Sequence, residues 1–334
     1  MEHRYLGNSG LLVSAIAYGN WVTHGNQVDD DTAIACIHTA LDAGITTFDT
    51  ADVYALGKAE EVMGRALAGV KREFYELCSK VYWPTGDGVN ERGLSRKHVM
   101  EGCDGSLRRL RTDHLDLYQA HRFDTETPLE ETMVAFADLV RAGKIHYVGV
   151  SEWTADQIRD AAAMAADLRI QLVSSQPQYS LIWRVIEGEV VPACRELGIS
   201  QIVWSPLAQG VLTGKYRPGE PLPAGSRAEG DTHEARMMAM MMNDELLDRV
   251  QELSQVADML GCSTAQLALA WVLRNDNVAA AIMGASRPDQ IVDNVGALDV
   301  ELTDEVAERI GELMAPSALT DPALTAQFAP MHRP

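Results

Sequence analysis

Short apolar runs rich in Val, Ile, Leu and Ala alternate with longer stretches in which apolar residues recur every three or four positions. The short runs predict strands and the longer stretches predict amphipathic helices. Strands are expected over residues 13–18, 46–50, 75–81, 115–121, 145–151, 172–176, 201–205 and 279–283. Helices are expected over 30–43, 59–68, 95–110, 129–142, 155–166, 186–197, 243–273 with a break near Gly261, and 289–297.

This order gives eight strands with a helical segment after each, the number of units that closes a parallel barrel. We therefore predict an α/β fold of the (β/α)8 TIM-barrel class, with a single domain over residues 1–334. An open dinucleotide-binding sheet would carry G-x-G-x-x-G directly after its first strand, and the sequence has no such motif there. Two regions fall outside the repeat. The segment 208–242 is a long loop whose Met-rich end, 237–242, is expected to be helical, and the tail 315–334 is expected to be irregular.

Composition narrows the kinds of partner. The chain has 334 residues and a formal net charge of −20, which disfavours nucleic acid because phosphate binding requires a basic face. Its five cysteines are scattered without ligand spacing, so neither a disulfide framework nor a structural metal is predicted. The first residues, MEHRYLGNSG, lack the features of a signal peptide, and no window is long enough to span a membrane. These features predict a cytoplasmic protein without membrane insertion.

Four residues that carry chemistry lie at the ends of neighbouring predicted strands. Asp49 ends the second strand, Lys80 the third and His121 the fourth, while Tyr54 lies in the turn after the second. The carboxyl ends of barrel strands meet at one face, where active sites are found. Because a buried carboxylate needs a partner, we expect Asp49 to pair with Lys80 beside the Tyr54 hydroxyl.

The four residue types together form an acid catalyst. A tyrosine has an ordinary pKa near 10, and a neighbouring ammonium should lower that pKa. Tyr54 would then give its proton to a carbonyl oxygen, which a neutral His121 would help to orient. Taken singly, such residues are more often structural, but four on successive units favour a catalytic site. Carbon–carbon bond chemistry through a Lys80 Schiff base is a weaker alternative.

Longer motifs resemble the aldo-keto reductase family. These are FDTADVY at 48–54, the strand ends at Lys80 and His121, QPQYSL at 176–181 and WSPLAQGVLTGKY at 204–216. The resemblance extends from Tyr5 to about Ala297. Two further segments, NERGLSRKHVMEG at 90–102 and VLRNDNVAAAIMGAS at 272–286, resemble the branch that contains the potassium-channel β subunits and their bacterial relatives.

The resemblance implies NADPH-dependent reduction of aldehydes or ketones to alcohols, with Asp49, Tyr54, Lys80 and His121 as the catalytic residues. The channel β subunits have asparagine at the position of His121, so a histidine here favours an ordinary reductase. The alternative is a redox-sensing regulatory subunit that binds NADPH, turns over slowly and has a membrane protein as its partner. The absence of an N-terminal extension before the barrel counts against that alternative. A homo-oligomer is also consistent with the branch.

The resemblance also supplies a cofactor site. It implies that Ser151 and Gln176, next to Asp49, hold the nicotinamide carboxamide and that Trp204 stacks on the ring. The residues implied for the pyrophosphate are Ser205, Leu207, Gly210 and Lys215, and those for the adenosine and 2′-phosphate are Gly284, Ser286, Arg287, Gln290 and Asn294. In GASRPDQ a helix N-terminus and the Arg287 guanidinium both suit a phosphate group.

The substrate site is predicted from aromatic loops. Trp21, Tyr82 and Trp83, together with Trp153, follow barrel strands and should form an apolar mouth around the carbonyl. No cluster of basic residues in these loops indicates an acidic substrate, although Arg122 could face either solvent or a ligand. Glu152 stands where the family commonly has asparagine or arginine, and we expect it to turn towards solvent.

Overall fold

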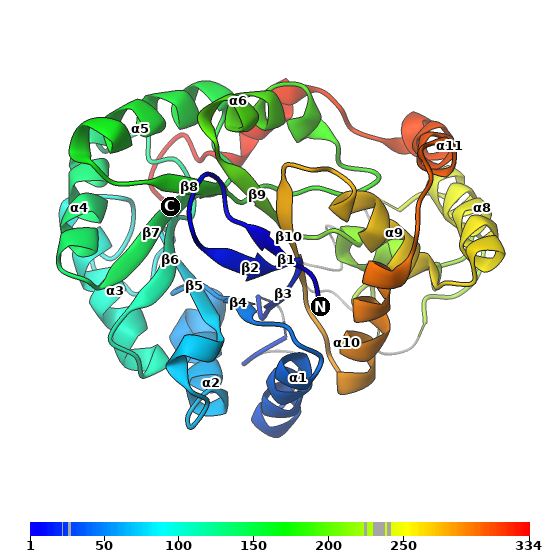
Figure 1. Cartoon of the computed structure of the whole chain (residues 1–334), viewed down its shortest axis with the longest axis horizontal. Helices are drawn as coiled ribbons and strands as arrows, with labels where there is room; N and C mark the ends of the chain where they lie inside the picture. The colour runs from blue at the N-terminus through cyan, green and yellow to red at the C-terminus, as the bar shows by residue number, and fades with distance from the viewer. Residues whose placement is uncertain (22, 26–27, 224–225, 230–237, 239–241) are drawn as a thin grey trace.

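The computed structural model describes residues 1–21, 23–25, 28–223, 226–229, 238 and 242–334. Its centre is a closed barrel of parallel strands in the order β10-β3-β4-β5-β6-β7-β8-β9 (Figure 1). The strands are β3 (Ile16–Gly19), β4 (Thr47–Asp49), β5 (Glu76–Val81), β6 (Leu115–Ala120), β7 (Ile145–Val150), β8 (Leu172–Ser175), β9 (Ser200–Val203) and β10 (Val278–Met283). The predicted (β/α)8 fold is therefore confirmed.

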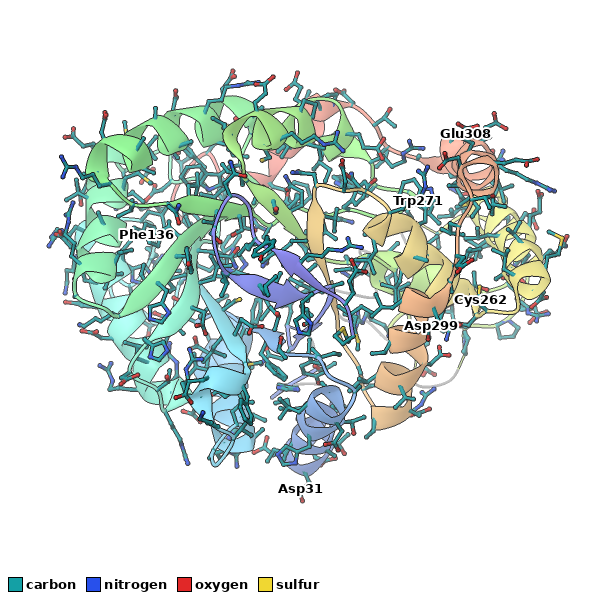
Figure 2. All side chains as sticks on the ribbon, viewed as in Figure 1. Asp31, Phe136, Cys262, Trp271, Asp299 and Glu308 are labelled. Atoms are coloured by element: carbon teal, nitrogen blue, oxygen red, sulfur yellow. The ribbon has the colours of Figure 1, made fainter. Side chains whose placement is uncertain are left out.

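Helices surround the barrel and bury one face against it. They are α1 (Asp30–Asp42), α2 (Lys58–Ala66), α3 (Arg96–Leu110), α4 (Leu129–Arg141), α5 (Ala155–Leu168), α6 (Val190–Leu197), α8 (Asp244–Leu260), α9 (Thr264–Leu273), α10 (Pro288–Val295) and α11 (Asp304–Met314). Phe136 of α4 is buried towards the strands, whereas Asp31 of α1 and Glu308 of α11 are exposed (Figure 2). This division is the amphipathic pattern from which helices such as α1 and α4 were predicted.

The predicted break near Gly261 is confirmed. Gly261 has a φ of 70°, the left-handed conformation that ends many helices, and it separates α8 from α9. The Ser263 side chain then caps α9 in a capping box with Gln266. Within the described residues, no single helix has the length and apolar composition of a membrane span, and only the bent pair α8–α9, which turns by 87°, meets both criteria.

The N-terminal segment differs from the prediction of one strand over 13–18. The chain instead forms an antiparallel hairpin of β1 (His3–Tyr5) and β2 (Leu12–Ser14), and the barrel begins only at Ile16. The Ser14 hydroxyl donates to the Ile16 carbonyl and accepts the N–H of Thr47, which fixes the bend between the two strands. The hairpin lies across the end of the barrel that faces the viewer in Figure 1. The apolar pattern hides this bend because residues on both sides of it are buried.

The C-terminal tail is more ordered than predicted. After α11, which the sequence pattern did not indicate, the tail contains the 3-10 segments η6 (Ala315–Ser317) and η7 (Pro322–Phe328). It is fixed to loops at the opposite end of the barrel from the hairpin. The Leu319 N–H donates to the Ile182 carbonyl, and Arg333 forms an ion pair of 3.0 Å with Asp124.

The long segment after β9 begins with η4 (Ala208–Thr213). Of the Met-rich stretch that we expected to be helical and packed, Met238 is fully buried and Met242 packs against the core. Residues 237 and 239–241 lie outside the described residues.

Candidate functional site

Asp49 and Lys80 form an ion pair at the carboxyl ends of β4 and β5, as the sequence pattern predicts. The Lys80 ammonium lies 2.6 Å from Asp49 Oδ2, and the two side chains are 0% and 5% exposed. Lys80 also donates to the Thr50 carbonyl at 2.7 Å and to the Tyr54 hydroxyl at 3.2 Å. The Gln176 amide donates to the other oxygen of Asp49 at 2.8 Å. Both charges are thus satisfied inside the protein, which is the condition for burying them.

The protonation states suit proton donation by Tyr54. Burial is the strongest influence on the pKa of Tyr54 and raises it above the ordinary value, even though the charge of Lys80 lowers it. The expected net lowering is therefore wrong for the free protein, because burial outweighs the ammonium. For Lys80, burial opposes the charge, but Asp49 and Tyr54 together raise the pKa. The phenol thus keeps its proton beside a permanent positive charge.

His121 completes this group from the end of β6. Its ring meets the Tyr54 ring edge-on, with centroids 5.7 Å apart. Burial, together with the charges of Arg122 and Lys80, holds the pKa of His121 well below its usual range. The imidazole is therefore neutral, the form predicted for a hydrogen-bond donor. Its buried Nδ1 has no partner within the described part of the chain.

Aromatic rings surround the Tyr54 and His121 pair. Trp21, which is 37% exposed, lies 6.5 Å from the Tyr54 ring and 5.8 Å from that of Trp204. On the opposite side, the Trp83 ring lies 6.4 Å from that of His121. These rings give the predicted apolar surroundings to the place where a carbonyl would meet the two donors.

Two of the aromatic residues proposed for the mouth lie elsewhere. Tyr82 is fully buried, and burial raises its pKa to about 12; it packs edge-on against Trp83 and supports that ring from behind. Trp153 is also buried, where it packs edge-on against Phe123. Both residues follow barrel strands, so their position in the sequence did not distinguish core from mouth.

Phe328 reaches the site from the C-terminal tail, and the sequence analysis missed it. Its ring lies 6.3 Å from that of Trp204 and 5.6 Å from that of Trp183. It is the only Phe, Tyr or Trp between residues 315 and 334, a signal that could have drawn attention to it. Nothing in the local pattern indicated that the tail returns to this end of the barrel.

Glu152 does not turn to solvent, so that expectation is wrong. It is 2% exposed, and its Oε1 accepts the Trp204 indole N–H at 2.7 Å and the Gln178 backbone N–H at 2.6 Å. Its φ of 56° is uncommon for a residue other than glycine. Glu152 therefore fixes the plane of Trp204, the ring that the family resemblance assigns to the nicotinamide.

The residues implied for the carboxamide lie beside the Asp49–Lys80 ion pair. The Ser151 hydroxyl donates to the Gln176 carbonyl at 2.8 Å, and the Gln176 side chain reaches Asp49. Both residues are buried at the ends of β7 and β8, whereas Trp204, after β9, is partly exposed. Ser151, Gln176 and Trp204 are the residues that would hold a nicotinamide here.

Basic residues gather beyond β9 and β10, where the phosphates are implied. Partial burial and the charges of Arg227 and Arg287 lower the pKa of Lys215, which places three cations within electrostatic reach of one another. Arg227 was missed by the sequence analysis; it donates to the Gln209 side chain at 2.5 Å. Gly210 has a φ of 98°, so the loop takes a conformation that favours glycine. This local charge on an acidic chain fits a phosphate-bearing cofactor.

The remaining implied residues form two groups, and Asn294 stands apart from both. Ser205 and Leu207 lead into η4, and the Ser205 hydroxyl accepts the Gln209 amide at 2.8 Å. Gly284, Ser286 and Arg287 are exposed before α10, with the Ser286 N–H donating to the Gln290 side chain at 2.9 Å. Asn294 is different, because it is buried and donates to the Met283 sulfur at 3.5 Å. It supports α10 from inside and does not join the exposed group.

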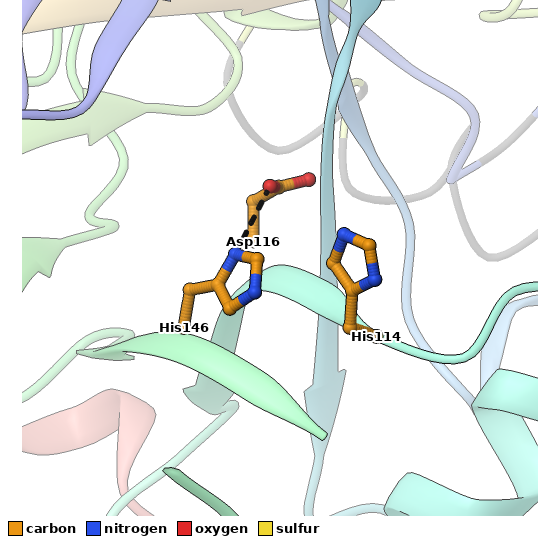
Figure 3. Close-up of side chains that lie close together, drawn as sticks. All are labelled: His114, Asp116 and His146. Atoms are coloured by element: carbon orange, nitrogen blue, oxygen red, sulfur yellow. Dashed lines mark ion pairs between the residues drawn. The ribbon is translucent and has the colours of Figure 1, made fainter. Parts of the chain in front are cut away.

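Among the described residues, one cluster has metal-ligating residue types, and it lies at the opposite end of the barrel. His114, Asp116 and His146 bring one donor atom each within 4.8 Å of the others (Figure 3). The stacked imidazole rings are 4.5 Å apart. Asp116 also accepts Arg72 at 2.6 Å and the Leu77 N–H at 2.7 Å, so local ion pairing accounts for the arrangement. The cluster lies near the start of β6 and β7, away from Tyr54.

Comparison with known proteins agrees with this geometry. The sequence profile described as "Aldo/keto reductase family" matches residues 15–315. A protein of Oryza sativa subsp. japonica named "Probable voltage-gated potassium channel subunit beta" is 44% identical over 318 residues, which cover 93% of this chain and 95% of the relative. The "Putative voltage-gated potassium channel subunit beta" of Schizosaccharomyces pombe is 41% identical, covering 93% and 92% of the two chains. A protein of Arabidopsis thaliana with the same name as the Oryza sativa protein is 42% identical, covering 94% of this chain and 97% of the relative. The chain therefore belongs to the aldo/keto reductase family, with similarity to the branch that the sequence motifs indicated.

Proposed function

We propose that the protein reduces an aldehyde or ketone to the alcohol with NADPH as the reductant. The observation that carries this proposal is the hydrogen bond of 3.2 Å between the Lys80 ammonium and the Tyr54 hydroxyl, inside a buried ion pair with Asp49. A protonated phenol, an ammonium kept charged by Asp49 and a neutral imidazole lie together, with aromatic rings next to them. This set suits a reaction in which negative charge develops on a carbonyl oxygen.

Each residue of the group has a separate role in the proposed reduction. When bound, a reduced nicotinamide would supply the hydride for the carbonyl carbon, and the protein would supply the proton. Tyr54 gives its proton to the carbonyl oxygen, so that the alcohol forms and the phenolate is held by Lys80. Asp49 keeps Lys80 charged and in place, and neutral His121 donates a hydrogen bond to the same oxygen. Proton uptake from solvent then restores Tyr54.

The preference for NADPH over NADH is part of the proposal. Lys215, Arg227 and Arg287 provide the positive charge near the loops after β9 and β10. Trp204, held by Glu152, provides the stacking surface, and Ser151 with Gln176 provides polar groups for the carboxamide. An exposed arginine guanidinium suits a phosphate because its planar fork offers two parallel donors.

A second candidate function is a regulatory subunit that binds NADPH and turns over slowly, with a membrane channel as its partner. It is favoured by the three relatives, which are named as "Probable" or "Putative voltage-gated potassium channel subunit beta". His121, with its neutral ring beside Tyr54, favours the reductase, because the channel β subunits that the sequence motifs resemble have asparagine at this position.

The deciding experiment is titration of the purified protein with NADPH, followed through quenching of tryptophan fluorescence, and then addition of a reactive aromatic aldehyde. Trp21 and Trp204 lie within the proposed site, so binding should alter their emission. Steady oxidation of NADPH after tight binding supports the reductase. Tight binding without turnover over a panel of aldehydes and ketones favours the regulatory candidate, and absence of binding contradicts both.

A further inference from the structure

The substrate end of the site contains a cation that the proposed reduction does not use. Arg122 follows His121 and is only partly exposed, with its guanidinium 5.5 Å from the Trp83 ring and 5.8 Å from the Phe328 ring. It lies after β6, three strands around the barrel from β9, whereas the cations that suit the cofactor phosphates follow β9 and β10. A positive charge at this position needs a different explanation.

The hydrogen bonds of Arg122 leave one edge of its guanidinium unused. Its Nη1 donates to the His121 carbonyl at 2.5 Å and lies 3.4 Å from the Ser151 hydroxyl. Its Nε is buried, and neither Nε nor Nη2 donates a hydrogen bond within the described part of the chain. A buried donor without a partner costs free energy, and the unused Nε–Nη2 edge has the geometry that pairs with a carboxylate.

No carboxylate of the described chain forms an ion pair with this edge. Glu152 is the acidic group whose charge acts on Arg122, but its Oε1 is occupied by the Trp204 indole and the Gln178 N–H. Asp124, two residues along the chain, is paired with Arg333 of the tail at 3.0 Å. Asp124 is thus held elsewhere, and Glu152 acts on Arg122 through its charge without forming an ion pair with it in the described chain.

We propose that Arg122 binds an anionic group of the substrate, so that the preferred substrates are short aldehydes or ketones bearing a carboxylate. This inference rests on the proposed reductase function. Trp83 lies against both His121 and Arg122, so the carbonyl at Tyr54 and the carboxylate at Arg122 are separated by a small ring or a few carbons. On a chain with a net charge of −20, Arg122 supplies the local positive charge that an anionic substrate requires, because Asp49 already neutralises Lys80.

The test compares each carboxybenzaldehyde isomer with its methyl ester, which removes the charge and keeps the aldehyde. The wild type should have a higher kcat/KM for at least one acid than for its ester. Arg122→Met should lower the acid-to-ester ratio of kcat/KM about 10- to 100-fold, mainly through KM, the usual effect of losing a charged hydrogen bond. Arg122→Lys should restore part of the ratio. Arg159→Met is the matched control, since Arg159 is exposed on α5 and pairs with Asp156.

Two outcomes overturn the inference. One is a wild type whose kcat/KM for every ester equals that for the matching acid. The other is an Arg122→Met variant whose kcat/KM falls equally for the acid and the ester. Equal loss means that Arg122 acts through His121 or through packing with Trp83 and Phe328. If Arg122→Met does not fold, the Arg122→Lys variant and the wild-type ratio decide.

A binding measurement separates this inference from the proposed function. NADPH-loaded protein is titrated with benzoate and with benzamide, and tryptophan fluorescence reports binding. If the wild type reduces no aldehyde but binds benzoate in preference to benzamide, and Arg122→Met abolishes that preference, the anion site stands and the reductase proposal fails. If the wild type shows no preference for benzoate, the anion site is contradicted whatever the turnover.

Discussion

The two ends of the barrel bury different kinds of side chain at their centres. At the amino ends of the strands, the hairpin of β1 and β2 closes the opening with apolar side chains: Leu6 and Val13 are fully buried against Ala17, Leu117 and Ile202. At the carboxyl ends, charged and polar side chains are buried among the apolar ones, with Asp49 and Lys80 at the centre. The first end adds free energy of folding through burial, and the second retains charges that a structural core would avoid.

This contrast teaches that stability and chemistry are separable in this chain. Burial of Lys80 requires Asp49, Thr50 and Tyr54 as partners, and the resulting arrangement is fixed before any ligand arrives. The apolar end has no such requirement, because aliphatic packing is not directional. Changes at the two ends should therefore have different readouts.

The largest expected effect is at the polar end. Tyr54→Phe removes the proposed proton donor, so kcat for carbonyl reduction should fall about 10²- to 10⁴-fold, the usual range for general acid catalysis. The NADPH affinity, measured by fluorescence titration, should change little, because the ring is retained. Tyr118→Phe on β6 is the matched control: Tyr118 is fully buried, its hydroxyl has no partner among the described residues, and its loss should leave kcat unchanged. Equal turnover by Tyr54→Phe and wild type would remove Tyr54 from its proposed role.

The apolar end should respond in stability alone. Leu6→Ala leaves a cavity between the hairpin and the barrel, and should lower the free energy of unfolding by about 2–5 kcal/mol. Urea denaturation measures this loss, and kcat of the folded variant should match that of the wild type. A large fall in kcat at wild-type stability would show that the hairpin influences the site, and would break the contrast between the two ends.

A buried histidine outside the proposed catalytic group sharpens the comparison. Burial lowers the pKa of His98, at the start of α3, to about 4, against an ordinary value near 6.5. As the pH falls below 6.5 the unfolded chain takes up a proton first, so the free energy of unfolding should decrease until the pH approaches 4. The protonation of His98 alone should lower the free energy of unfolding by about 2 kcal/mol between pH 6.5 and pH 5.

The test is urea denaturation at several pH values. His98→Leu should flatten the acid side of the stability profile while leaving the pH profile of carbonyl reduction unchanged. His121→Asn should also flatten the stability profile, because the pKa of His121 is likewise depressed by burial, but it should alter catalysis as well. An unchanged stability profile in both variants would mean that neither ring is held neutral in the fold.

The polar end was also the more predictable from sequence. Asp49, Lys80 and His121 were found because each ends a strand, and a parallel barrel brings such ends together whatever the detailed packing. The missed residues Arg227 and Phe328 come from a long loop and from the tail, whose paths depend on tertiary contacts with no local period.

The errors have equally local causes. The bend at Ser14 was hidden because the residues on both sides are buried, so the apolar run does not break. Glu152 was expected in solvent because a carboxylate usually lies there, but its positive φ turns it inward to the Trp204 indole. A backbone conformation of this kind leaves no mark on residue type when the residue is not glycine.

The smallest expected effect concerns the exposed rim of the polar end. Arg287 is 63% exposed and pairs with Asp289 at 2.8 Å, so its removal should cost little stability. If its guanidinium binds the 2′-phosphate, Arg287→Ala should weaken NADPH binding about tenfold and leave NADH binding nearly unchanged, because only NADPH carries that phosphate. Fluorescence titration with both cofactors measures the ratio, with Arg274→Ala as control, since Arg274 is an exposed arginine paired with Asp304 in the same manner. An unchanged ratio of NADPH to NADH affinity would mean that Lys215 and Arg227 bind the phosphate instead. Arg287 would then matter as little for the choice of cofactor as it does for stability.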